Sequence, residues 1–490
     1  MKYDVAVVGA GPVGTTLAAL LAKRGLSVVV LERDLDIYPL PRAAHLDGET
    51  ARNLREIGGW LDTPGWSLAN EGMDFVSGEG ELLLRMSSKH NPEHTVAQSN
   101  LFHQPSLDRL LRDRAAHYGA ELRLGHEVTA IHDTAEGVRV DATTSDGSSI
   151  VVDASWLVGC CGARSFVRRH LGVTQIDLEF NEPWLVVDII VSGDDPRPPQ
   201  RAAQVCDPIR PHTIVPMPGV RRRFEFMLLP GENPDDINQP DVIETLMAPY
   251  LPPGSATVER SAVYTFHGLI TREWRQGRVL LAGDSAHQMP PFLGQGMCSG
   301  IRDAVNLAWK LTAVIRGADE SLLDTYQPER SPHVQRIVES AVGFGRIICT
   351  LDPAVAAERD RNMLAARAAN PADVGEAPQP SLSGSSLIVE GAGYVVSDGL
   401  LDGVVFDEVL DGRWTVVVAD ESVLVAADRT TLARIDAQIL VAREGLVTQR
   451  ILDNAQSDVV VVRPDRIVLG AGRLGLDALA RAIDEFALVS

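Results

Sequence analysis

The stretch YDVAVVGAGPVGTTLAALLAKRGLSVVVLER, from Tyr3 to Arg33, decides the fold of this chain. Two short apolar runs within it, Tyr3–Val8 and Leu26–Leu31, are typical of buried parallel strands. The segment between them, Thr15–Arg24, has the composition of a helix. Strand, helix and strand in this order predict a βαβ unit at the start of a Rossmann-like α/β domain.

The turn between the first strand and the helix reads Gly9-Ala10-Gly11-Pro12-Val13-Gly14, the G-x-G-x-x-G pattern of dinucleotide binding. Gly9 permits a tight turn, Gly11 lets the backbone approach a pyrophosphate, and Gly14 lets helix and strand pack closely. The helix N-terminus offers free N–H groups and a positive dipole end to the phosphates. Glu32, which closes the second strand, can accept hydrogen bonds from a ribose diol. Because all these parts occur in order, we favour a dinucleotide site over an ordinary glycine-rich loop.

The composition of the 490 residues is that of a globular protein with room for two or three domains. The formal net charge of -21 argues against a nucleic-acid partner and against docking on an anionic membrane. No apolar run reaches the roughly 18 residues of a membrane span, and the first strand begins too early to leave room for a signal peptide. The five cysteines are odd in number and form no CxxC pattern, which fits a reducing cytoplasm.

The pattern changes along the rest of the chain. Between Trp184 and His267, short strands separated by Pro and Gly turns predict an antiparallel sheet. Further along, the pattern predicts a buried strand over Gly277–Asp284 and a helix over Asp303–Ile315. The expected organisation is a discontinuous dinucleotide-binding domain (1–180 and 268–350), a sheet domain (181–267), a Pro- and Gly-rich linker (351–386) and a compact α/β module (387–490).

A second G-x-G-x-x-G, Gly470–Gly475, follows a strand near the end of the sequence. Only one helix of chain remains after it, so no second βαβ unit and no ribose-binding acid can form there. We therefore expect no resident nucleotide at this motif, and a nicotinamide partner would visit rather than reside.

Pro41-Arg42-Ala43-Ala44 predicts the start of a helix that continues to Ile57. At such a helix start the guanidinium of Arg42 can reach a phosphate. A surface salt bridge is the alternative for this side chain.

Three motifs in the same order resemble those of the single-component (class A) FAD-dependent aromatic hydroxylases, the p-hydroxybenzoate hydroxylase-like flavoprotein monooxygenases. They are GAGPVG with Glu32, GCCGARSFVRR from Gly159, and AGDSAHQMPPFLGQGMCSGIRDAVNLAWKL from Ala282. The resemblance covers roughly Lys2–His333 and is greatest to the 3-(3-hydroxyphenyl)propionate hydroxylases. It implies an FAD-binding domain interleaved with an antiparallel-sheet substrate domain, followed by a thioredoxin-like module. That module has no cysteine, which excludes redox chemistry and leaves a structural or dimer-contact role, as in a homodimer.

The resemblance implies how FAD would be held, without a covalent bond. Gly9, Gly11, Pro12, Val13 and Gly14 would hold the pyrophosphate, and Glu32 the adenosine ribose. The further contacts it implies are Arg33 beside the adenine, Arg42 at the pyrophosphate, Gln104 near the ribitol, the backbone of Val128 at the adenine, and Gly283 with Asp284 at a ribitol hydroxyl. The flavin ring would meet the loop containing Pro291, Gly294 and Gly296, and flavin N1 and O2 would meet the N–H groups of Met297 and Cys298.

The chain departs from the family pattern within two of the motifs. Cys161 stands where the family usually has an aspartate that serves flavin and pyridine-nucleotide handling. In the last motif, Leu293 stands where glycine is common and Cys298 where asparagine is common. A contact made by the backbone survives a change of side chain.

The implied reaction is hydroxylation of a small phenolic ring by O₂, with NADPH or NADH as the transient electron donor and no metal. It would proceed through a flavin C4a-hydroperoxide and place oxygen ortho to an existing hydroxyl. A tailoring hydroxylase of a larger polycyclic aromatic or polyketide is an alternative, as is an FAD oxidoreductase that does not hydroxylate. A flavin-binding sensor without enzymatic activity is the third.

Three residues are the candidates for roles at the substrate. Pro291 aligns with a family proline whose carbonyl faces the substrate ring. Arg223 opens the strand Arg223–Phe226, where related enzymes place substrate-binding or flavin-contacting groups; the alternative is a solvated turn over Arg221–Arg223. His45 either lines the flavin ring or is a histidine satisfied by its neighbours. His212 and His267 are weaker candidates.

Overall fold

The computed structural model describes residues 2–40, 42–58, 67–88, 91–134, 136–193, 201–375 and 379–488. Its first large sheet contains the expected βαβ unit. Its strands are, in spatial order, β17 (Arg275–Gln276), β18 (Val279–Leu281), β11 (Ser149–Gly159), β1 (Lys2–Val8), β2 (Val28–Glu32) and β8 (Glu121–Leu124), with β10 (Gly137–Thr144) and β9 (His126–Thr134) joined through β11. β18, β11, β1, β2 and β8 are parallel. The helix α1 (Pro12–Lys23) connects β1 to β2, and its apolar side chains are almost completely buried.

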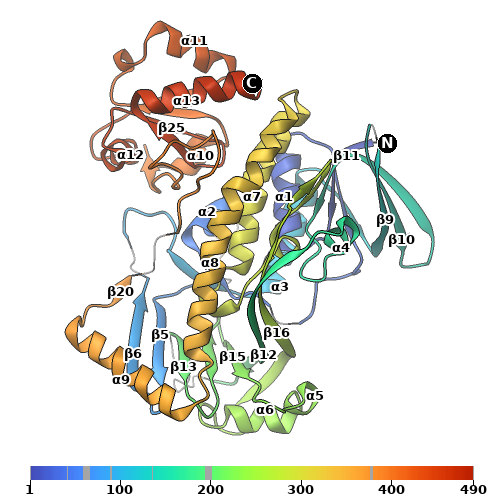
Figure 1. Ribbon diagram of the computed structural model, residues 1–490, viewed down its shortest axis with the longest axis vertical. Helices are drawn as coiled ribbons and strands as arrows, with labels where there is room; N and C mark the ends of the chain where they lie inside the picture. The colour runs from blue at the N-terminus through green and yellow to red at the C-terminus, as the bar shows by residue number, and fades with distance from the viewer. Residues whose placement is uncertain are drawn as a thin grey trace.

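A second sheet lies below the first in Figure 1 and has nine strands. In spatial order they are β19 (His287–Gln288), β16 (Ala256–Thr271), β12 (Gln175–Val191), β15 (Arg221–Met227), β14 (His212–Pro216), β13 (Ala202–Cys206), β5 (Gly72–Ser77), β6 (Leu82–Ser87) and β20 (Val374–Gly375). Most neighbours are antiparallel, but β13 pairs with β5 and β6 with β20 in parallel. The predicted antiparallel sheet is therefore the centre of a larger mixed sheet, because strands from outside 181–267 complete its edge.

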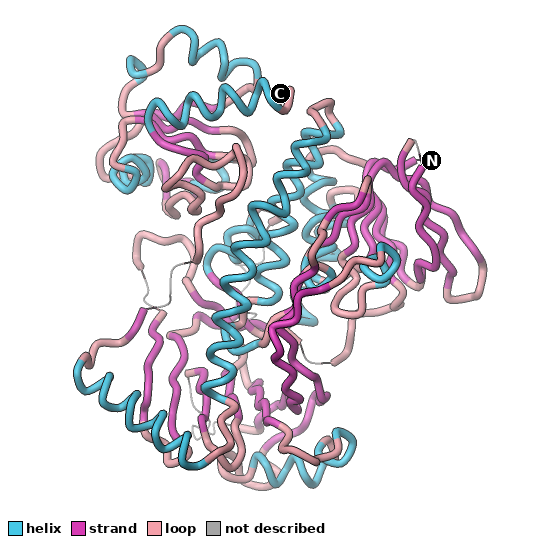
Figure 2. The backbone as a smooth tube through the Cα atoms, viewed as in Figure 1, coloured by secondary structure: helices cyan, strands magenta, loops and turns pink. Residues whose placement is uncertain are grey.

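Two long helices, α7 (Gly296–Ile315) and α8 (Tyr326–Ile348), run between the two sheets (Figures 1 and 2). α7 begins at Gly296 rather than at the predicted Asp303. Its first turns pack tightly against α1, since a Cβ added at Gly300 would lie 2.5 Å from Cγ2 of Val13. Gly300, which is unfavourable for a helix by propensity, is required there by close packing.

The predicted helix from Pro41 to Ile57 is wrong in its first half, and Pro41 itself lies outside the described residues. Arg42–Ala44 is irregular, and β3 (His45–Asp47) pairs with β7 (Ser99–Phe102), which also pairs with β4 (Ser67–Ala69). The helix α2 (Gly48–Arg55) starts only after Asp47, whose side chain accepts a hydrogen bond from the N–H of Thr50 (2.8 Å). Arg42 therefore lies on a loop and not at a helix start.

The segment expected to be a linker contains a helix of 17 residues, α9 (Pro353–Ala369), and the edge strand β20. Asp352 caps α9 by accepting from the N–H groups of Ala354 and Val355. The chain then enters a separate module beside α7 (Figure 1). Its central sheet has the order β24 (Gln438–Val441), β23 (Thr415–Val418), β25 (Val459–Val462) and β26 (Val468–Ala471), and its larger helices are α11 (Ala426–Arg434), α12 (Val447–Ala455) and α13 (Gly472–Glu485).

The glycines of the second G-x-G-x-x-G are packed against other parts of the chain. A Cβ added at Gly475 would lie 2.7 Å from the carbonyl oxygen of Gly470, and one at Gly470 would lie 2.7 Å from Cγ2 of Val389. These glycines allow β26, α13 and the incoming chain to pack closely within the module.

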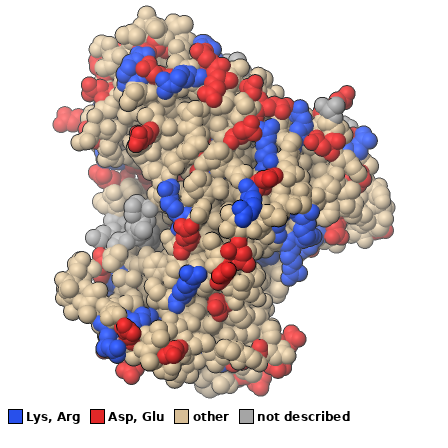
Figure 3. All heavy atoms as spheres, in the orientation of Figure 1, with Lys and Arg blue, Asp and Glu red and all other residues tan. Residues whose placement is uncertain are grey.

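Acidic and basic side chains are interspersed over the face of the molecule in Figure 3. Among the described residues no single helix is long and apolar enough to cross a bilayer. The bent pair Glu320–Ile348 and Pro353–Ala369 passes that test by length and composition only when both helices are counted together.

Candidate functional site

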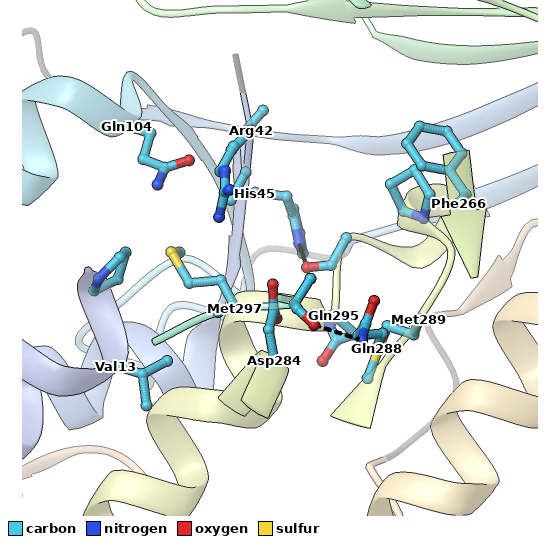
Figure 4. Close-up of a pocket in the computed structure, with 18 of the residues that line it drawn as sticks. Val13, Arg42, His45, Gln104, Phe266, Asp284, Gln288, Met289, Gln295 and Met297 are labelled. Atoms are coloured by element: carbon cyan, nitrogen blue, oxygen red, sulfur yellow. Dashed lines mark hydrogen bonds between the residues drawn. The ribbon is translucent and has the colours of Figure 1, made fainter. Parts of the chain in front are cut away.

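One large cavity, of about 1910 Å³, connects the first glycine turn with the second sheet. Its walls come from the turn after β1, the loop between β19 and α7, the start of the helix α3 (Gln104–His117), and one face of the nine-stranded sheet. Figure 4 shows Arg42, Gln104, Asp284 and Met297 converging on the same open space from separate elements. Motifs more than 200 residues apart in the sequence thus meet around a single elongated space.

The three glycines of the first turn have different surroundings. Gly9 has φ +108°, and a Cβ there would lie 2.5 Å from the carbonyl oxygen of Cys160. A Cβ at Gly14 would lie 2.1 Å from the carbonyl oxygen of Gly9. A Cβ at Gly11 meets nothing within 4 Å. Gly9 and Gly14 therefore allow the chain to pack closely against itself, whereas Gly11 borders the open space of the cavity.

Glu32 is held in place beside this turn. Its Oε2 accepts from the N–H of Ala10 (2.7 Å) and its Oε1 from the N–H of Asp34 (3.0 Å). The carboxylate lines the cavity, as does the neighbouring side chain of Arg33, which is 62% exposed and lies 3.7 Å from Asp34. Val128, on β9, forms part of the same wall and is buried. The residues predicted for the adenosine end are thus adjacent in space.

Arg42 and Asp284 face each other across the cavity (Figure 4). The guanidinium of Arg42 lies over the ring of Tyr38, with its Cζ 4.4 Å from the ring centroid. Burial alone would lower the pKa of Arg42, but the Asp284 carboxylate together with Tyr38 and Tyr264 outweighs burial, and the pKa is raised. Arg42 therefore presents a permanent positive charge, and Asp284 an acceptor, to whatever occupies the space between them.

Gln104 is the first residue of α3 and is buried against the cavity. Its Nε2 donates to Oδ2 of Asp108 (3.4 Å), while Oε1 of Gln104 and Oδ1 of Asp108 have no partner among the described residues. Burial raises the pKa of the Asp108 carboxyl to about 7. Buried polar atoms without partners indicate a polar ligand. Sequence reasoning missed Asp108, although its spacing of four residues from Gln104 places both on one helix face.

The loop before α7 forms the central wall. Pro291 closes a short turn through its carbonyl, which accepts from the N–H of Gly294 (2.7 Å), and Gly294 has φ +64°. The N–H groups of Met297 and Cys298 in the first turn of α7 have no acceptor among the described residues. The thiol of Cys298 points away, donating to the carbonyls of His45 and Gly294, and burial raises its pKa to about 12. Only the backbone of Cys298 is thus available to a ligand.

His45 supports this loop from β3. Its Nε2 lies 2.8 Å from Oγ of Ser99, and its Nδ1 lies 3.3 Å from the carbonyl oxygen of Gly294. A Cβ at Gly294 would lie 2.7 Å from that Nδ1. Burial lowers the pKa of His45, so the ring is neutral at pH 7. The observed hydrogen bonds fit a histidine that positions the Gly294 turn while lining the cavity.

Arg223 is buried on β15, so the alternative of a solvated turn over Arg221–Arg223 is wrong. Its guanidinium forms two hydrogen bonds to Asp188 (2.7 and 3.1 Å), and its Nη1 donates to the carbonyl of Arg42. Although Arg223 lines the cavity, its hydrogen-bond donors are used by these contacts, and it stabilises the loop that carries Arg42. His212 and His267 each bond to neighbouring residues, Tyr250 and Asn181 respectively.

The middle motif contributes Arg168, whose contacts the sequence did not reveal. Its guanidinium donates to the carbonyls of Ala163 (2.7 Å), Ser285 (3.3 Å) and Asp284 (3.4 Å). It thereby ties the middle motif to the Gly-Asp turn of the last one. Cys161 also lines the cavity, with its Sγ 3.0 Å from Oγ of Ser165.

The lining matches FAD in chemistry and in order. There is room at Gly11 for a pyrophosphate, with Arg42 as a cation beside it. An unpartnered amide oxygen on Gln104 and a carboxylate on Asp284 suit a polyol, and free N–H groups at the start of α7 suit an electron-rich ring edge.

Comparisons with known proteins agree with this geometry. A family model described as "FAD binding domain" matches residues 2–341. A protein of Rhodococcus jostii (strain RHA1), named as a probable NADH-specific resorcinol 4-hydroxylase, is 39% identical over 494 residues, which cover 96% of this chain and 92% of that protein.

Two further proteins extend the comparison. The 3-(3-hydroxy-phenyl)propionate/3-hydroxycinnamic acid hydroxylase of Escherichia coli (strain K12) is 35% identical, but the match covers 71% of this chain and only 62% of that protein. The structure of an anhydrotetracycline hydroxylase from Streptomyces rimosus is similar over 99% of both chains, with a TM-score of 0.75 and 25% identity. The similarity thus includes the C-terminal module.

Proposed function

The chain belongs to the FAD binding domain family, and from this membership we propose that it is an FAD-dependent monooxygenase that hydroxylates a phenolic ring with NADH and O₂. The observation that carries the proposal is the continuity of one cavity from the Gly11 turn to the face of the second sheet. A cofactor held along the first part would present its ring to a substrate held in the second. The relative named as a resorcinol hydroxylase supports a small dihydroxybenzene as substrate and NADH as electron donor.

Bound FAD, once reduced, supplies O₂ activation and transfer of one oxygen atom to an electron-rich ring. The residues of this chain bind the cofactor, orient the substrate ring beside it and exclude water from the reaction. Gly11, Arg42 and Asp284 would hold the chain of the cofactor, and the free N–H groups of Met297 and Cys298 would stabilise negative charge at its ring. His45, neutral and bonded to Gly294, keeps this loop in position.

Aromatic side chains close the cavity beside the loop. Phe292 makes edge-to-face contacts with Trp184 (5.5 Å between centroids) and Phe266 (6.2 Å). Such a wall keeps water from the reacting ring and holds a flat substrate in one plane.

The direct test uses the purified full-length protein. We expect a flavin absorbance spectrum and NADH oxidation that rises when resorcinol is added, with a product heavier by one oxygen atom derived from ¹⁸O₂. NADH oxidation that no phenol stimulates, or stimulation that yields only hydrogen peroxide, would contradict the proposal. Including a tricyclic phenol in the panel tests the second candidate, a hydroxylase of larger polycyclic substrates, to which the full-length similarity with the anhydrotetracycline hydroxylase points.

Replacing Arg42 with glutamine is expected to weaken FAD binding by about 1.5–3 kcal/mol, roughly ten- to hundredfold, because a charge-assisted hydrogen bond to phosphate is lost. Fluorescence titration of the apoprotein with FAD measures this. The matched control is Arg109→Gln, exposed on α3 and not part of the cavity lining, where we expect a loss of less than about 1 kcal/mol. Equal losses in both variants would mean that Arg42 contributes only general positive charge.

We also infer that the C-terminal module is a structural, thioredoxin-like domain without redox function. Its sheet order β24-β23-β25-β26 combines one parallel pair with two antiparallel ones, and its sequence contains no cysteine. A reducing, cytoplasmic location fits the five free thiols of the chain.

A further inference from the structure

Three polar residues form a straight row across three neighbouring strands of the second sheet. Gln204 on β13 is directly opposite Thr213 on β14, and Thr213 is directly opposite Glu225 on β15. All three are buried, with 1%, 2% and 7% of their surface exposed. We call Gln204, Thr213 and Glu225 the polar row.

The polar row faces the cavity. The residues that alternate with it, such as Ile214, Phe224 and Phe226, pack on the opposite face against α5 (Pro234–Ile237) and α6 (Pro240–Met247). Because side chains alternate between faces along a strand, the row points the other way. Its neighbours on the cavity wall are mainly apolar: Met73, Leu84, Val186, Val215, Val263 and Phe344.

The polar row has hydrogen-bonding capacity that the protein leaves unused. The hydroxyl of Thr213 donates to Oε1 of Gln204 (2.6 Å), which leaves the Gln204 amide nitrogen as a donor. Among the described residues no hydrogen bond reaches the Glu225 carboxyl, and the nearest cation, Arg223, stays 3.8 Å from its Oε1. Burial raises the pKa of Glu225. Buried polar groups beside a cavity are normally satisfied, so a row of them indicates a ligand with hydroxyl groups.

Two cations among the described lining residues, Arg223 and Arg336, both have other partners. Arg223 is committed to Asp188 and to the Arg42 carbonyl. Arg336, on α8, is exposed and donates to the carbonyl of Ser381 (2.8 Å). A ligand carboxylate placed beside Glu225 would be buried next to an acid whose nearest cation, Arg223, is already paired with Asp188, which is unfavourable.

We propose that the polar row selects the substrate: it binds the ring hydroxyls of an uncharged phenol, and Glu225 excludes phenols that carry a carboxylate on the same side. This inference rests on the proposed function and deepens it. It separates this chain from relatives named for hydroxyphenylpropionate, a ring with an acidic side chain.

The test compares resorcinol with 3-(3-hydroxyphenyl)propionate as probes of the FAD-loaded enzyme. Dissociation constants come from calorimetry without NADH, and kcat/KM from product formation. For the wild type we expect resorcinol to be preferred at least tenfold by both measures. Glu225→Gln should bind resorcinol about tenfold more weakly, because one hydrogen bond to an ionisable group is lost. It should also reduce the preference for resorcinol over 3-(3-hydroxyphenyl)propionate. Glu244→Gln, exposed on α6 behind the sheet, is the matched control and should behave as the wild type.

Thr213→Val keeps the shape of the side chain and removes its hydroxyl, so it tests the row if Glu225→Gln does not fold. We expect this variant to bind resorcinol several-fold more weakly and to prefer resorcinol over 3-(3-hydroxyphenyl)propionate less strongly. If both variants keep the wild-type ratio of resorcinol affinity to 3-(3-hydroxyphenyl)propionate affinity, the proposal is wrong, although the monooxygenase function is unaffected. A wild type that prefers the carboxylate probe would overturn it as well. If no phenol stimulates the wild type, the proposed function itself has failed.

Discussion

Replacing Gly11 with alanine is expected to abolish FAD binding while leaving the folded apoprotein intact. Gly11 has φ -77° and ψ 179°, values that alanine adopts freely. A Cβ there meets no protein atom within 4 Å, and glycine and alanine at a helix N-cap differ by at most about 1 kcal/mol. The methyl group would instead occupy the space beside the helix N-terminus, where the backbone must approach the pyrophosphate.

Gly14→Ala is the informative contrast, because it should damage the apoprotein itself. Its Cβ would lie 2.1 Å from the backbone oxygen of Gly9, and no flexible side chain can move to relieve that contact. Overpacking of this kind typically costs about 1–3 kcal/mol of stability, and a clash with backbone lies at the upper end or beyond.

Thermal unfolding of both apoproteins, repeated with excess FAD, separates the two effects. Gly11→Ala should unfold at the wild-type temperature and show no shift with FAD, whereas wild-type protein is stabilised by ligand in proportion to RT ln(1 + [FAD]/Kd). Gly14→Ala should unfold early in both conditions. Normal FAD binding by Gly11→Ala would mean that the pyrophosphate does not lie at this turn.

Replacing Glu329 with glutamine is expected to destabilise the protein by about 3–5 kcal/mol, the usual cost of breaking a buried ion pair. Glu329, on α8, has a fully buried side chain. It accepts from Lys310 (2.9 Å) and Asn306 (2.8 Å) on α7, from Ser385 (2.6 Å), and through both oxygens from Arg463 in the C-terminal module (3.0 and 2.9 Å). Glutamine would leave two buried cations without their shared anion.

The stability contribution of Glu329 should also depend on pH. Burial alone would raise its pKa, but Arg463 and Lys310 lower it well below the ordinary 4.5. A depressed carboxyl pKa adds stability that is complete above the unfolded value and is lost as the pH falls through the folded one. The difference between wild type and Glu329→Gln should therefore be full at pH 7 and shrink progressively below about pH 4.5.

Calorimetric unfolding at several pH values measures the loss of stability and its pH dependence. Limited proteolysis between α9 and the module reports whether the module has detached. Glu339→Gln, ten residues further along α8, is the control: Glu339 is exposed and bonds only to Gln335 (2.8 Å) among the described residues. Equal stability of the two variants would show that Glu329 does not hold the module to α7 and α8.

The grouping of the residues around the first glycine turn could be predicted from the sequence because their geometry is local. Gly9, Gly11, Gly14 and Glu32 lie within one βαβ unit, whose spacing alone places them together. The loop at Arg42 was predicted as a helix because proline and alanine favour one, whereas pairing between β3 and β7, more than fifty residues apart, overrides that local preference.

The polar row could not be predicted, because its geometry is not local. Gln204, Thr213 and Glu225 are unremarkable polar residues in three different strands, and only the register of the sheet brings them into one row. Arg223 was a candidate because it opens a strand on which related enzymes place substrate-binding groups, but its partner Asp188 lies on another strand and takes up its donors. Pairing between distant strands carries no signal in a single sequence.

The contacts of α7 have a consequence for synthesis of the protein. Asn306 and Trp309 both donate to Asp465 (3.3 and 3.1 Å), and the buried Lys310 shares Glu329 with Arg463. A nascent chain that has not yet passed residue 465 can pair Asn306 and Lys310 with Glu329, but it leaves Trp309 without its acceptor and Glu329 without Arg463. Trp309 lies on the helix whose first turn borders the Gly294 loop. Translation from N- to C-terminus therefore completes the βαβ unit around Gly11 first and the contacts that hold α7 and α8 to the C-terminal module last, so loading of the proposed FAD should be completed only after that module has been translated.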